Sequence, residues 1–303
     1  MFTADAHIAA ADARGDFPPP PASDEEGATD VHAGDGTGHS EEIPTSQAII
    51  EVIDVRKIFA GKDGAEFEAI APLSLKVRKG EFVAVVGTSG CGKSTLLRII
   101  AGLMSPSSGQ VVINHRVIAE PDGKTGIVFQ SPVLLPWRTV RENVELHLDI
   151  NSAKNKRKHS AEVDRLIALV GLEGFEHCRP YELSGGMQQR VALCRALIHN
   201  PSLLLMDEPF GALDAVTREQ MNVELQRIWL ETGKTVVLIT HSITEAAFLA
   251  DRIIVMSSRP GRITAELNVR LPRPRDFKSV RDEEYFQVCD HVRALMNAVG
   301  MME

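Results

Sequence analysis

The sequence of 303 residues has few of the features that mark secreted, membrane-spanning or zinc-binding proteins. Its four cysteines, Cys91, Cys178, Cys194 and Cys289, are scattered and form no C-x-x-C pair. This spacing suggests neither a zinc site nor a disulfide framework, and it fits a reducing cytosol. No Lys/Arg cluster precedes an apolar core near the N-terminus, and no apolar run approaches the ~20 residues of a membrane helix. We therefore expect that the chain neither crosses a membrane nor is exported.

The sequence also lacks a net positive charge. Residues 1–45 hold ten acidic side chains against a single base, Arg14, while the whole chain has a formal net charge of −8, so the rest is close to neutral. A net field that favours nucleic acid is absent, and we expect no nucleic-acid partner. The first 45 residues are also rich in Pro and Gly and have almost no bulky apolar side chains, which predicts a disordered acidic tail.

The stretch VAVVGTSGCGKSTLL, from Val83 to Leu97, predicts a phosphate-binding loop. An apolar strand leads into glycines, whose missing side chains let backbone N–H groups close around an anion, and a helix begins near Lys93 with its positive end there. The pattern G-x-x-x-x-G-K-[ST] places Lys93 on the β- and γ-phosphates and the hydroxyl of Ser94 on Mg²⁺. The glycines of this loop are Gly87, Gly90 and Gly92.

Three further apolar strands end in residues that can act on a phosphate. The run from Leu203 reaches two acids, which is costly unless a cation lies there; with Mg²⁺, Asp207 would bind the ion through water and Glu208 would polarise the attacking water. His241 follows the run TVVLIT and can donate to the γ-phosphate or the water, and Gln130 ends TGIVFQ and can join Mg²⁺ and the water. Since strands that end together form one edge of a sheet, we expect a single phosphate site there.

A second helix start has the character of an anion site. Ser184 caps the helix, and two glycines follow in its first turn, Gly185 and Gly186. Two glycines there would destabilise the helix without benefit unless the backbone closely approaches an anion. The chain thus has two helix N-termini suited to phosphate.

Apolar strands alternate with helices from about Ala48 onward, which predicts an α/β fold with a mainly parallel sheet covered on both faces. Between its strands the period turns helical, so we expect an all-helical subdomain at about 131–200. The predicted organisation is an acidic tail at 1–45, a main domain at 46–275 and a C-terminal helical extension at 276–303.

Two helix starts in this scheme have a Ser or Thr followed three residues later by Glu. Thr139 with Glu142 predicts a capping box at the start of a helix over 139–148. Ser242 with Glu245 predicts a second capping box after the strand that ends at His241.

Taken in order, GTSGCGKST, Gln130, LSGGMQQR, LLLMDEP, Ala212-Leu213-Asp214 and His241 resemble the motif set of an ABC-type ATPase subunit, over about residues 48–260. The resemblance implies the P-loop NTPase fold, with a RecA-like core, an antiparallel β part and an inserted helical subdomain, and ATP and Mg²⁺ as cofactors. It implies that the adenine stacks on Phe59, where the family more often has Tyr or Trp.

The resemblance also assigns roles to the other motif residues. The catalytic residues would be Lys93, Gln130, Glu208 and His241, and the residues around Mg²⁺ would be Ser94, Gln130 and Asp207. The nucleotide would lie on Gly87, Thr88, Ser89, Gly90, Cys91, Gly92, Lys93, Ser94 and Thr95.

A head-to-tail homodimer, or a pair of ATPase subunits, is a further implication of the resemblance. The second helix start of one copy would cover the ATP held by the other copy's glycine loop, and Asp214 would couple the two sites. The covering residues would be Ser184, Gly185, Gly186 and Gln188.

More narrowly, LLPWRTVRENV, DEPFGALDAVTRE, and SSRPGRI followed by LPRPRD resemble importer ATPases for nitrate, sulfonates and taurine. Importers of pyrimidine and thiamine precursors have very similar sequences, so they stay as an alternative. The resemblance implies hydrolysis of ATP to power uptake of a small solute through an integral membrane permease, with a solute-binding protein as an indirect partner. It places the subunit in the cytoplasm, on the inner face of the cell membrane.

The permease would contact the helical block at Leu135, Pro136 and Trp137, although plain packing explains Trp137 equally well. A non-transport ABC ATPase acting on DNA or in translation is a less favoured alternative, because the sequence has neither a second cassette nor long coiled coils that split the cassette. A regulatory module that uses ATP only to dimerise is disfavoured by the presence of Glu208 and His241.

Overall fold

The computed structural model describes residues 48–61, 64–151, 156–257 and 260–300. The predicted acidic tail at 1–45 lies outside the described residues. Within the described part of the chain, none of the helices is both long enough and apolar enough to cross a bilayer. The strands are β1 (Ala48–Ala60), β2 (Glu66–Arg78), β3 (Phe82–Gly87), β4 (Ser108–Ile113), β5 (Arg116–Val117), β6 (Thr125–Val128), β7 (Leu203–Asp207), β8 (Thr235–Ile239), β9 (Arg252–Ser257) and β10 (Arg262–Asn268). The α-helices are α1 (Lys93–Ile100), α2 (Val140–Val144), α3 (Leu146–Asn151), α4 (Lys156–Leu169), α5 (Gly185–Leu197), α6 (Ala215–Thr232), α7 (Ile243–Leu249) and α8 (Glu283–Gly300).

The described strands form two sheets. One has four strands in the order β2-β1-β4-β5, all antiparallel to their neighbours. The other has six strands in the order β10-β9-β3-β8-β7-β6, in which β10 is antiparallel to β9 and the remaining pairs are parallel. The predicted α/β class, with a mainly parallel sheet and a separate antiparallel part, is confirmed.

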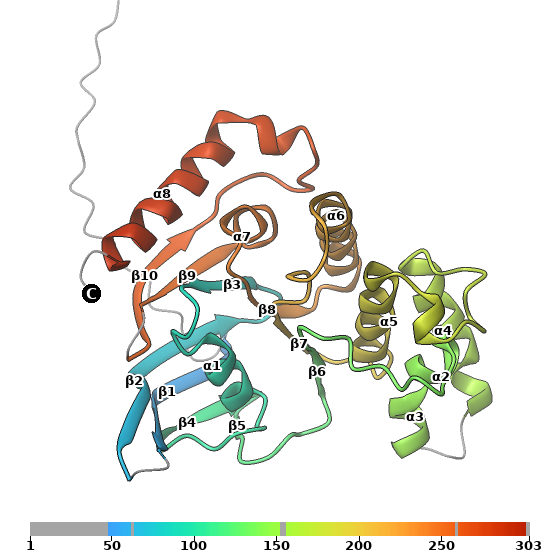
Figure 1. The fold of residues 1–303 in the computed structure, drawn as a ribbon, viewed down its shortest axis with the longest axis horizontal. Coiled ribbons are helices and arrows are strands. Elements are labelled where there is room, and N and C mark those ends of the chain that lie inside the picture. Colours follow the sequence, from blue (N-terminus) through green and yellow to red (C-terminus); the bar gives the residue numbers. More distant parts are fainter. Residues whose placement is uncertain (1–47, 62–63, 152–155, 258–259, 301–303) are drawn as a thin grey trace, which may run out of the picture. The chain divides into compact units, whose positions relative to one another are not determined.

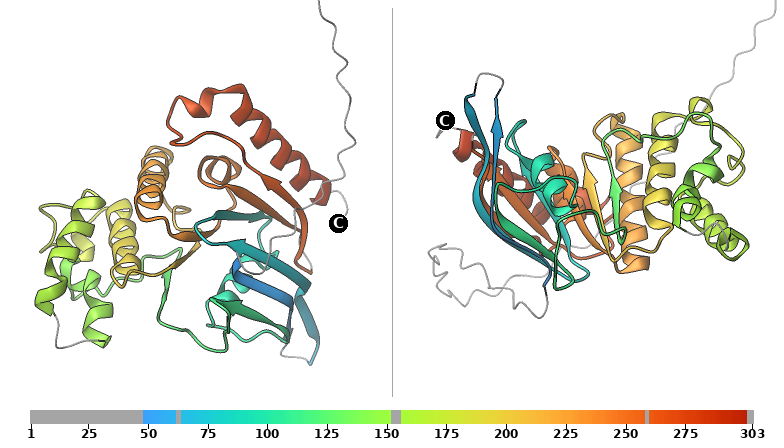
Figure 2. Two further views of the ribbon diagram at one scale, coloured as in Figure 1. Left: turned by 180° about the vertical axis from the view of Figure 1, so that it is seen from behind. Right: turned by 90° about the horizontal axis from the view of Figure 1, so that it is seen from below.

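Both faces of the six-stranded sheet are covered, which explains why its central strand β3 is buried along its whole length. Side chains alternate along β3: Val83 and Val85 belong to the core shared with α1 and the antiparallel sheet. Phe82, Ala84 and Val86 belong to the core shared with α5, α6, α7 and α8. Figures 1 and 2 show α1 between the two sheets and α6, α7 and α8 on the opposite face of the parallel sheet.

The segment between β6 and β7 forms α2, α3, α4 and α5, so its predicted helical character is confirmed. The first capping box is present, since the Thr139 hydroxyl accepts from Glu142 N at 3.3 Å and the Glu142 carboxylate accepts from Thr139 N at 2.8 Å. The prediction of one helix over 139–148 is wrong in its continuity, because the backbone turns at Glu145, with a ψ of −9°, and the segment forms α2 and α3, although Glu145 N still donates to Arg141 O at 2.9 Å.

The connection that follows β6 is bound to helix α5. Gln189 Nε2 donates to Phe129 O at 3.2 Å, and Arg195 donates to Val133 O at 2.7 Å and to Pro132 O at 2.8 Å. These side chains donate to carbonyls of an irregular segment, which lies between β6 and α2 and forms neither helix nor strand.

The segment that follows β10 is anchored to helix α7. Arg275 is only 1% exposed, and its Nη1 donates to the carbonyls of Ala247, Phe248 and Ala250 at 3.0, 3.0 and 2.8 Å. These carbonyls lie at the C-terminal end of α7, where a helix has no backbone donors and favours a positive charge. The C-terminal helix α8 adds a further contact, since the Tyr285 hydroxyl donates to Thr244 O at 2.8 Å.

Candidate functional site

The predicted phosphate loop joins β3 to α1. Its residues are Gly87 at the end of β3, then Thr88, Ser89, Gly90, Cys91 and Gly92, then Lys93, Ser94 and Thr95 in the first turn of α1. Gly92 precedes the helix with a φ of 93°, and a Cβ there would lie 3.0 Å from Ala69 O. Glycine suits this position because other residues rarely adopt such a φ.

The Lys93 side chain lies inside this loop. It is 5% exposed, and its ammonium donates to Gly87 O at 2.8 Å and to Thr88 O at 2.9 Å. The thiol of Cys91 is fully buried beneath it, 3.7 Å from Lys93 Nζ, and burial raises the pKa of this thiol. The side chain of Cys91 is thus part of the packing of the loop.

The first acid of β7 meets the start of α1. The Ser94 hydroxyl donates to Asp207 Oδ1 at 2.7 Å, and Asp207 is 7% exposed at the end of a fully buried strand. This contact joins two residues that are 113 positions apart in the sequence, as expected for parallel strands that end at one edge of a sheet.

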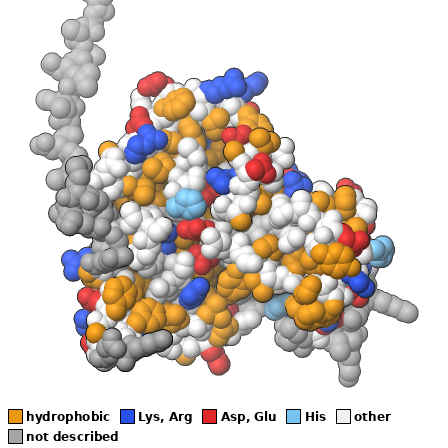
Figure 3. Space-filling view, in the orientation of Figure 1, with side chains coloured by type: hydrophobic (Ala, Val, Ile, Leu, Met, Phe, Trp, Pro, Cys, Tyr) orange, Lys and Arg blue, Asp and Glu red, His pale blue; other side chains and the backbone are white. Residues whose placement is uncertain are grey.

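The second acid of β7 lies between Gln130 and His241. Glu208 Oε2 is 3.2 Å from His241 Nδ1 and 3.4 Å from Gln130 Nε2. The backbone of Glu208 has a φ of 46°, in the left-handed region that non-glycine residues rarely occupy, while its N–H still donates to Ile239 O at 2.9 Å. Near the middle of the face in Figure 3, a histidine side chain lies beside acidic ones.

A cavity of about 270 Å³ extends from the loop to two aromatic rings. One ring is the predicted Phe59 on β1, and the other is Phe67 on β2, its direct partner in the antiparallel register. They are 37% and 50% exposed. Phe67 was not predicted as a site residue from the sequence. The feature that could have indicated it is the alternation of Phe67 with Ala69 along β2. The cavity is lined by Phe59, Phe67, Ala69, Ser89, Gly90, Gly92, Lys93, Ser94, Thr95 and Glu208.

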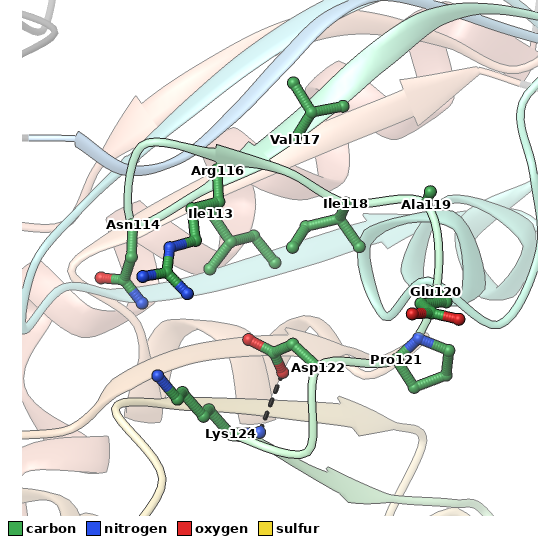
Figure 4. Close-up of a pocket in the computed structure, with 10 residues that line it drawn as sticks. All are labelled: Ile113, Asn114, Arg116, Val117, Ile118, Ala119, Glu120, Pro121, Asp122 and Lys124. Atoms are coloured by element: carbon green, nitrogen blue, oxygen red, sulfur yellow. Dashed lines mark hydrogen bonds between the residues drawn. The ribbon is translucent and has the colours of Figure 1, made fainter.

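A larger cavity, of about 560 Å³, lies between the β4–β5 hairpin and the segment that leads to β6. The side chains of Arg116 and Asp122 extend into it from opposite walls (Figure 4). Its charges are mixed, with Arg116 and Lys124 against Glu120 and Asp122, and it contains none of the predicted site residues. Size alone therefore does not identify the functional site of this chain.

The second predicted anion site, at the start of α5, has no contact with the glycine loop among the interactions of the described residues. The Ser184 hydroxyl accepts from Met187 N at 3.3 Å, as a helix cap does, and Gln188 Nε2 donates to Pro180 O at 2.9 Å. A Cβ on Gly186 would lie 2.7 Å from Thr217 Cγ2, so close packing of α5 on α6 already requires glycine there.

Asp214 caps helix α6. Its carboxylate accepts from Thr217 N at 3.0 Å and from the Thr217 hydroxyl at 2.6 Å. These hydrogen bonds, the one from the hydroxyl foremost, hold the pKa of Asp214 below its usual range. The role of Asp214 between two subunits stays a prediction.

The capping box predicted for Ser242 and Glu245 is only half formed. The Ser242 hydroxyl accepts from Glu245 N at 3.2 Å, but Ser242 N donates to Thr240 Oγ1 at 3.0 Å instead of to the glutamate. The Glu245 carboxylate is buried and accepts from the Thr240 hydroxyl. The prediction is wrong for the bond from Ser242 N to the Glu245 carboxylate. The Thr240 hydroxyl, two residues before Ser242, bonds to both of these groups instead.

A strand, a glycine loop that encloses a lysine, and two acids at the end of another parallel strand of the same sheet define a P-loop nucleotide-binding protein. Residues 70–211 match the ABC transporter family. The chain belongs to this family, as its relatives also show, and it is an ATPase whose nucleotide is ATP, as the sequence predicts.

The relatives include ATP-binding proteins of importers. A nitrate import ATP-binding protein of Synechocystis sp. is 42% identical over 253 residues, which cover 82% of this chain and 94% of that protein. A taurine import ATP-binding protein of Roseobacter denitrificans is 49% identical over 210 residues, which cover 69% of this chain and 77% of that protein. The resemblance to importer ATPases of this type is thus confirmed.

A solved structure supports the fold. A dimeric ATP-binding cassette in a post-hydrolysis state, bound to ADP and Pi, is 35% identical with a TM-score of 0.65, covering 73% of this chain and 99% of that one. The predicted P-loop NTPase fold is confirmed.

Proposed function

We propose that this chain is the ATP-hydrolysing subunit of an importer that takes up a small solute of the nitrate, sulfonate or taurine type through a membrane permease. The observation that carries the hydrolytic part is the group formed by Glu208, His241 and Gln130 beside the glycine loop. The nitrate and taurine import relatives support the solute class.

The residues around Ser94 fit Mg²⁺ by their donor chemistry. Ser94 supplies a hydroxyl, Asp207 a carboxylate and Gln130 an amide oxygen, and oxygen ligands are those that Mg²⁺ prefers. The contact between Ser94 and Asp207 places two of these groups together. When bound, the ion would neutralise charge on the β- and γ-phosphates.

In hydrolysis, Lys93 would exchange its contacts with loop carbonyls for the β- and γ-phosphate oxygens and stabilise charge that develops on them. Glu208 would accept a hydrogen bond from the attacking water and polarise it. His241, in contact with Glu208, would hold that geometry against the γ-phosphate. Phe59 would stack on the adenine.

Two copies would assemble head to tail, with the α5 helix start of one copy over the ATP of the other. The dimeric state of the cassette described above supports the pairing of two copies. In the chain itself, α5 begins at Gly185 after the cap Ser184, and the N-terminus of a helix favours an anion. Gly185 and Gln188 would then complete a site that the Lys93 loop forms only in part, and Asp214 would lie between the two sites.

The permease would contact the connection between β6 and α2. Trp137 there is 69% exposed and Val133 is 59% exposed, which is unusual for large apolar side chains. Pro136 is exposed and Leu135 half-buried beside them. Figure 3 shows hydrophobic side chains over the helices of this region. The subunit would accordingly lie in the cytoplasm on the inner face of the membrane, and a solute-binding protein would act through the permease.

Substitution of Glu208 tests the hydrolytic role. We expect Glu208→Gln to bind ATP within about 3-fold of the wild type and to lose at least about 100-fold in turnover, the lower end for loss of a general base. Glu284→Gln, at an exposed acid of α8, serves as the control and should hydrolyse ATP normally. Wild-type turnover in Glu208→Gln would remove Glu208 from the mechanism.

The solute class needs a test in cells. Deletion of the gene should reduce uptake of nitrate, taurine or an alkanesulfonate, and the wild-type chain, but not Glu208→Gln, should restore it. Unchanged uptake of all three solutes in the deletion strain would refute the proposed class.

A further inference from the structure

A buried carboxyl group lies behind the pair formed by Glu208 and His241. The side chain of Glu245, on α7, is 4% exposed and lines a small enclosed pocket together with both residues. Its Oε2 accepts from the hydroxyl of Thr240, whereas its Oε1 has no hydrogen-bond partner. Burial of such a group is unfavourable, so its retention calls for a physical reason.

Three hydrogen bonds link Glu245 to the residues on either side of His241. The Thr240 hydroxyl donates to Glu245 Oε2, and the same hydroxyl oxygen accepts from Ser242 N at 3.0 Å. Ser242 Oγ in turn accepts from Glu245 N at 3.2 Å. Because His241 is the single residue between Thr240 and Ser242, this closed ring fixes the backbone on both sides of the imidazole.

Within the described ranges of the chain, no ion pair accounts for the position of Glu245. The cation in the pocket, Arg218 on α6, donates to Phe210 O at 3.2 Å and to Leu213 O at 2.7 Å. Desolvation raises the pKa of Glu245 to about 7, against the opposing effects of Arg218 and His241 and with a contribution from Glu208. The hydrogen bond from Thr240 therefore orients the carboxyl group in either protonation state.

Helix capping does not explain the arrangement either. Glu142 occupies the same third position in α2, and its carboxylate accepts from Thr139 N in an ordinary capping box near the surface. Glu245 instead turns inward, toward the strand end that precedes His241. The chain thus contains an ordinary capping glutamate, Glu142, and an inward-turned glutamate at the same helix position, Glu245, and the second lies at the candidate site.

We propose that Glu245 is a positioning residue for ATP hydrolysis, which holds His241 beside Glu208 by fixing Thr240 and Ser242. The proposal rests on the proposed roles of His241 and Glu208. Without the ring, the backbone at His241 gains freedom while the phosphate loop keeps its contacts. The loss should therefore fall on kcat and not on ATP binding.

The test compares variants of the full chain by steady-state ATPase kinetics, ATP binding and urea unfolding. We expect Glu245→Ala and Thr240→Val to lower kcat about 10- to 100-fold, the range for a misplaced catalytic group, with KM within about 3-fold. Glu245→Gln and Thr240→Ser keep the acceptor and the hydroxyl, so they should recover most of that loss. The double variant Glu245→Ala/Thr240→Val should be no slower than either single one.

Glu142→Ala is the matched control, since it removes a glutamate from the same helix position away from the site and should leave kcat unchanged. The proposal is overturned by wild-type kcat in Glu245→Ala, by Glu245→Gln as slow as Glu245→Ala, or by additive losses in the double variant. If Glu245→Ala does not fold, the pair Thr240→Val and Thr240→Ser decides by the same criteria.

Glu208→Gln and His241→Ala, measured in the same assay, distinguish failure of the role proposed for Glu245 from failure of the proposed hydrolytic site. If both lose turnover while Glu245→Ala does not, only the role of Glu245 fails. If Glu208→Gln and His241→Ala keep turnover, the proposed hydrolytic site itself fails.

Discussion

Replacement of Arg275 by Met removes the side chain that joins the C-terminal segment to helix α7. The guanidinium group contacts four carbonyls, three buried ones at the end of α7 and that of the half-buried Leu271 at 3.2 Å. Burial lowers the pKa of Arg275 to about 10, so the group is still charged at pH 7 and its hydrogen bonds are charge-assisted. Met fills most of the volume of the aliphatic stem, so the change acts on the hydrogen bonds more than on packing.

The expected loss of stability follows from these contacts. Nη1 has two N–H groups for its three acceptors, so the guanidinium group forms the equivalent of about three hydrogen bonds. At about 1.5 kcal/mol for each charge-assisted bond, they give roughly 4 kcal/mol in total. Release of the buried charge reduces this figure, while the carbonyls left without donors increase it. We therefore expect Arg275→Met to lower the free energy of unfolding by about 3–5 kcal/mol, a large part of the stability of an ordinary domain.

Equilibrium urea unfolding measures this change, with the denaturant slope checked against the wild type. Arg293→Met is the matched control, because Arg293 lies in the same C-terminal region with an exposed side chain paired to Asp290. An exposed pair contributes at most about 1 kcal/mol, so this variant should unfold almost like the wild type. A loss below about 1 kcal/mol in Arg275→Met would refute the anchoring role of Arg275.

Three further outcomes are expected. Phe67→Ala and Phe59→Ala should each weaken ATP binding in calorimetry by roughly 5- to 50-fold, the effect of losing one stacked ring, and an unchanged Kd in Phe67→Ala would exclude its contact with the base. Ser184→Ala should lose about 1 kcal/mol in urea unfolding as the bond from Met187 N is lost, and Ser184→Thr should keep most of it. The folded chain holds a proton on Glu245 up to about pH 7, whereas its ordinary pKa is 4.5. Stability should therefore fall by roughly 3 kcal/mol between pH 4.5 and 7 relative to Glu245→Gln, and parallel pH profiles would contradict this.

The sequence was informative where local chemistry decides the structure. The glycine loop, the strand ends and the cap at Thr139 depend on residue types a few positions apart, and each formed as predicted. The contacts of Ser94 with Asp207 and of Glu208 with His241 followed from one rule, that parallel strands end at one edge.

The remaining features depend on distant packing, which sequence patterns do not record. Glu245 has the spacing of a capping residue, yet burial beside Thr240 gives it a different partner. Phe67 became a candidate site residue only when the hairpin register placed it opposite Phe59. Gly186 was interpreted through an anion alone, although its contact with Thr217 on another helix is enough to require glycine.

The attachment of the helices to the sheet has a mechanical consequence. Strand β6 has four residues and, among the described strands, is bonded to β7 alone, at the edge of the sheet. The connection beyond it is held by Gln189 and Arg195 of α5. The backbone on both sides of Gln130 is therefore bonded to helix α5, whereas the backbone of Glu208 is bonded to the sheet through Ile239 O. If α5 tilted about β6, the distance of 3.4 Å between Gln130 Nε2 and Glu208 Oε2 would change. This distance therefore reports the position of α5 relative to the sheet.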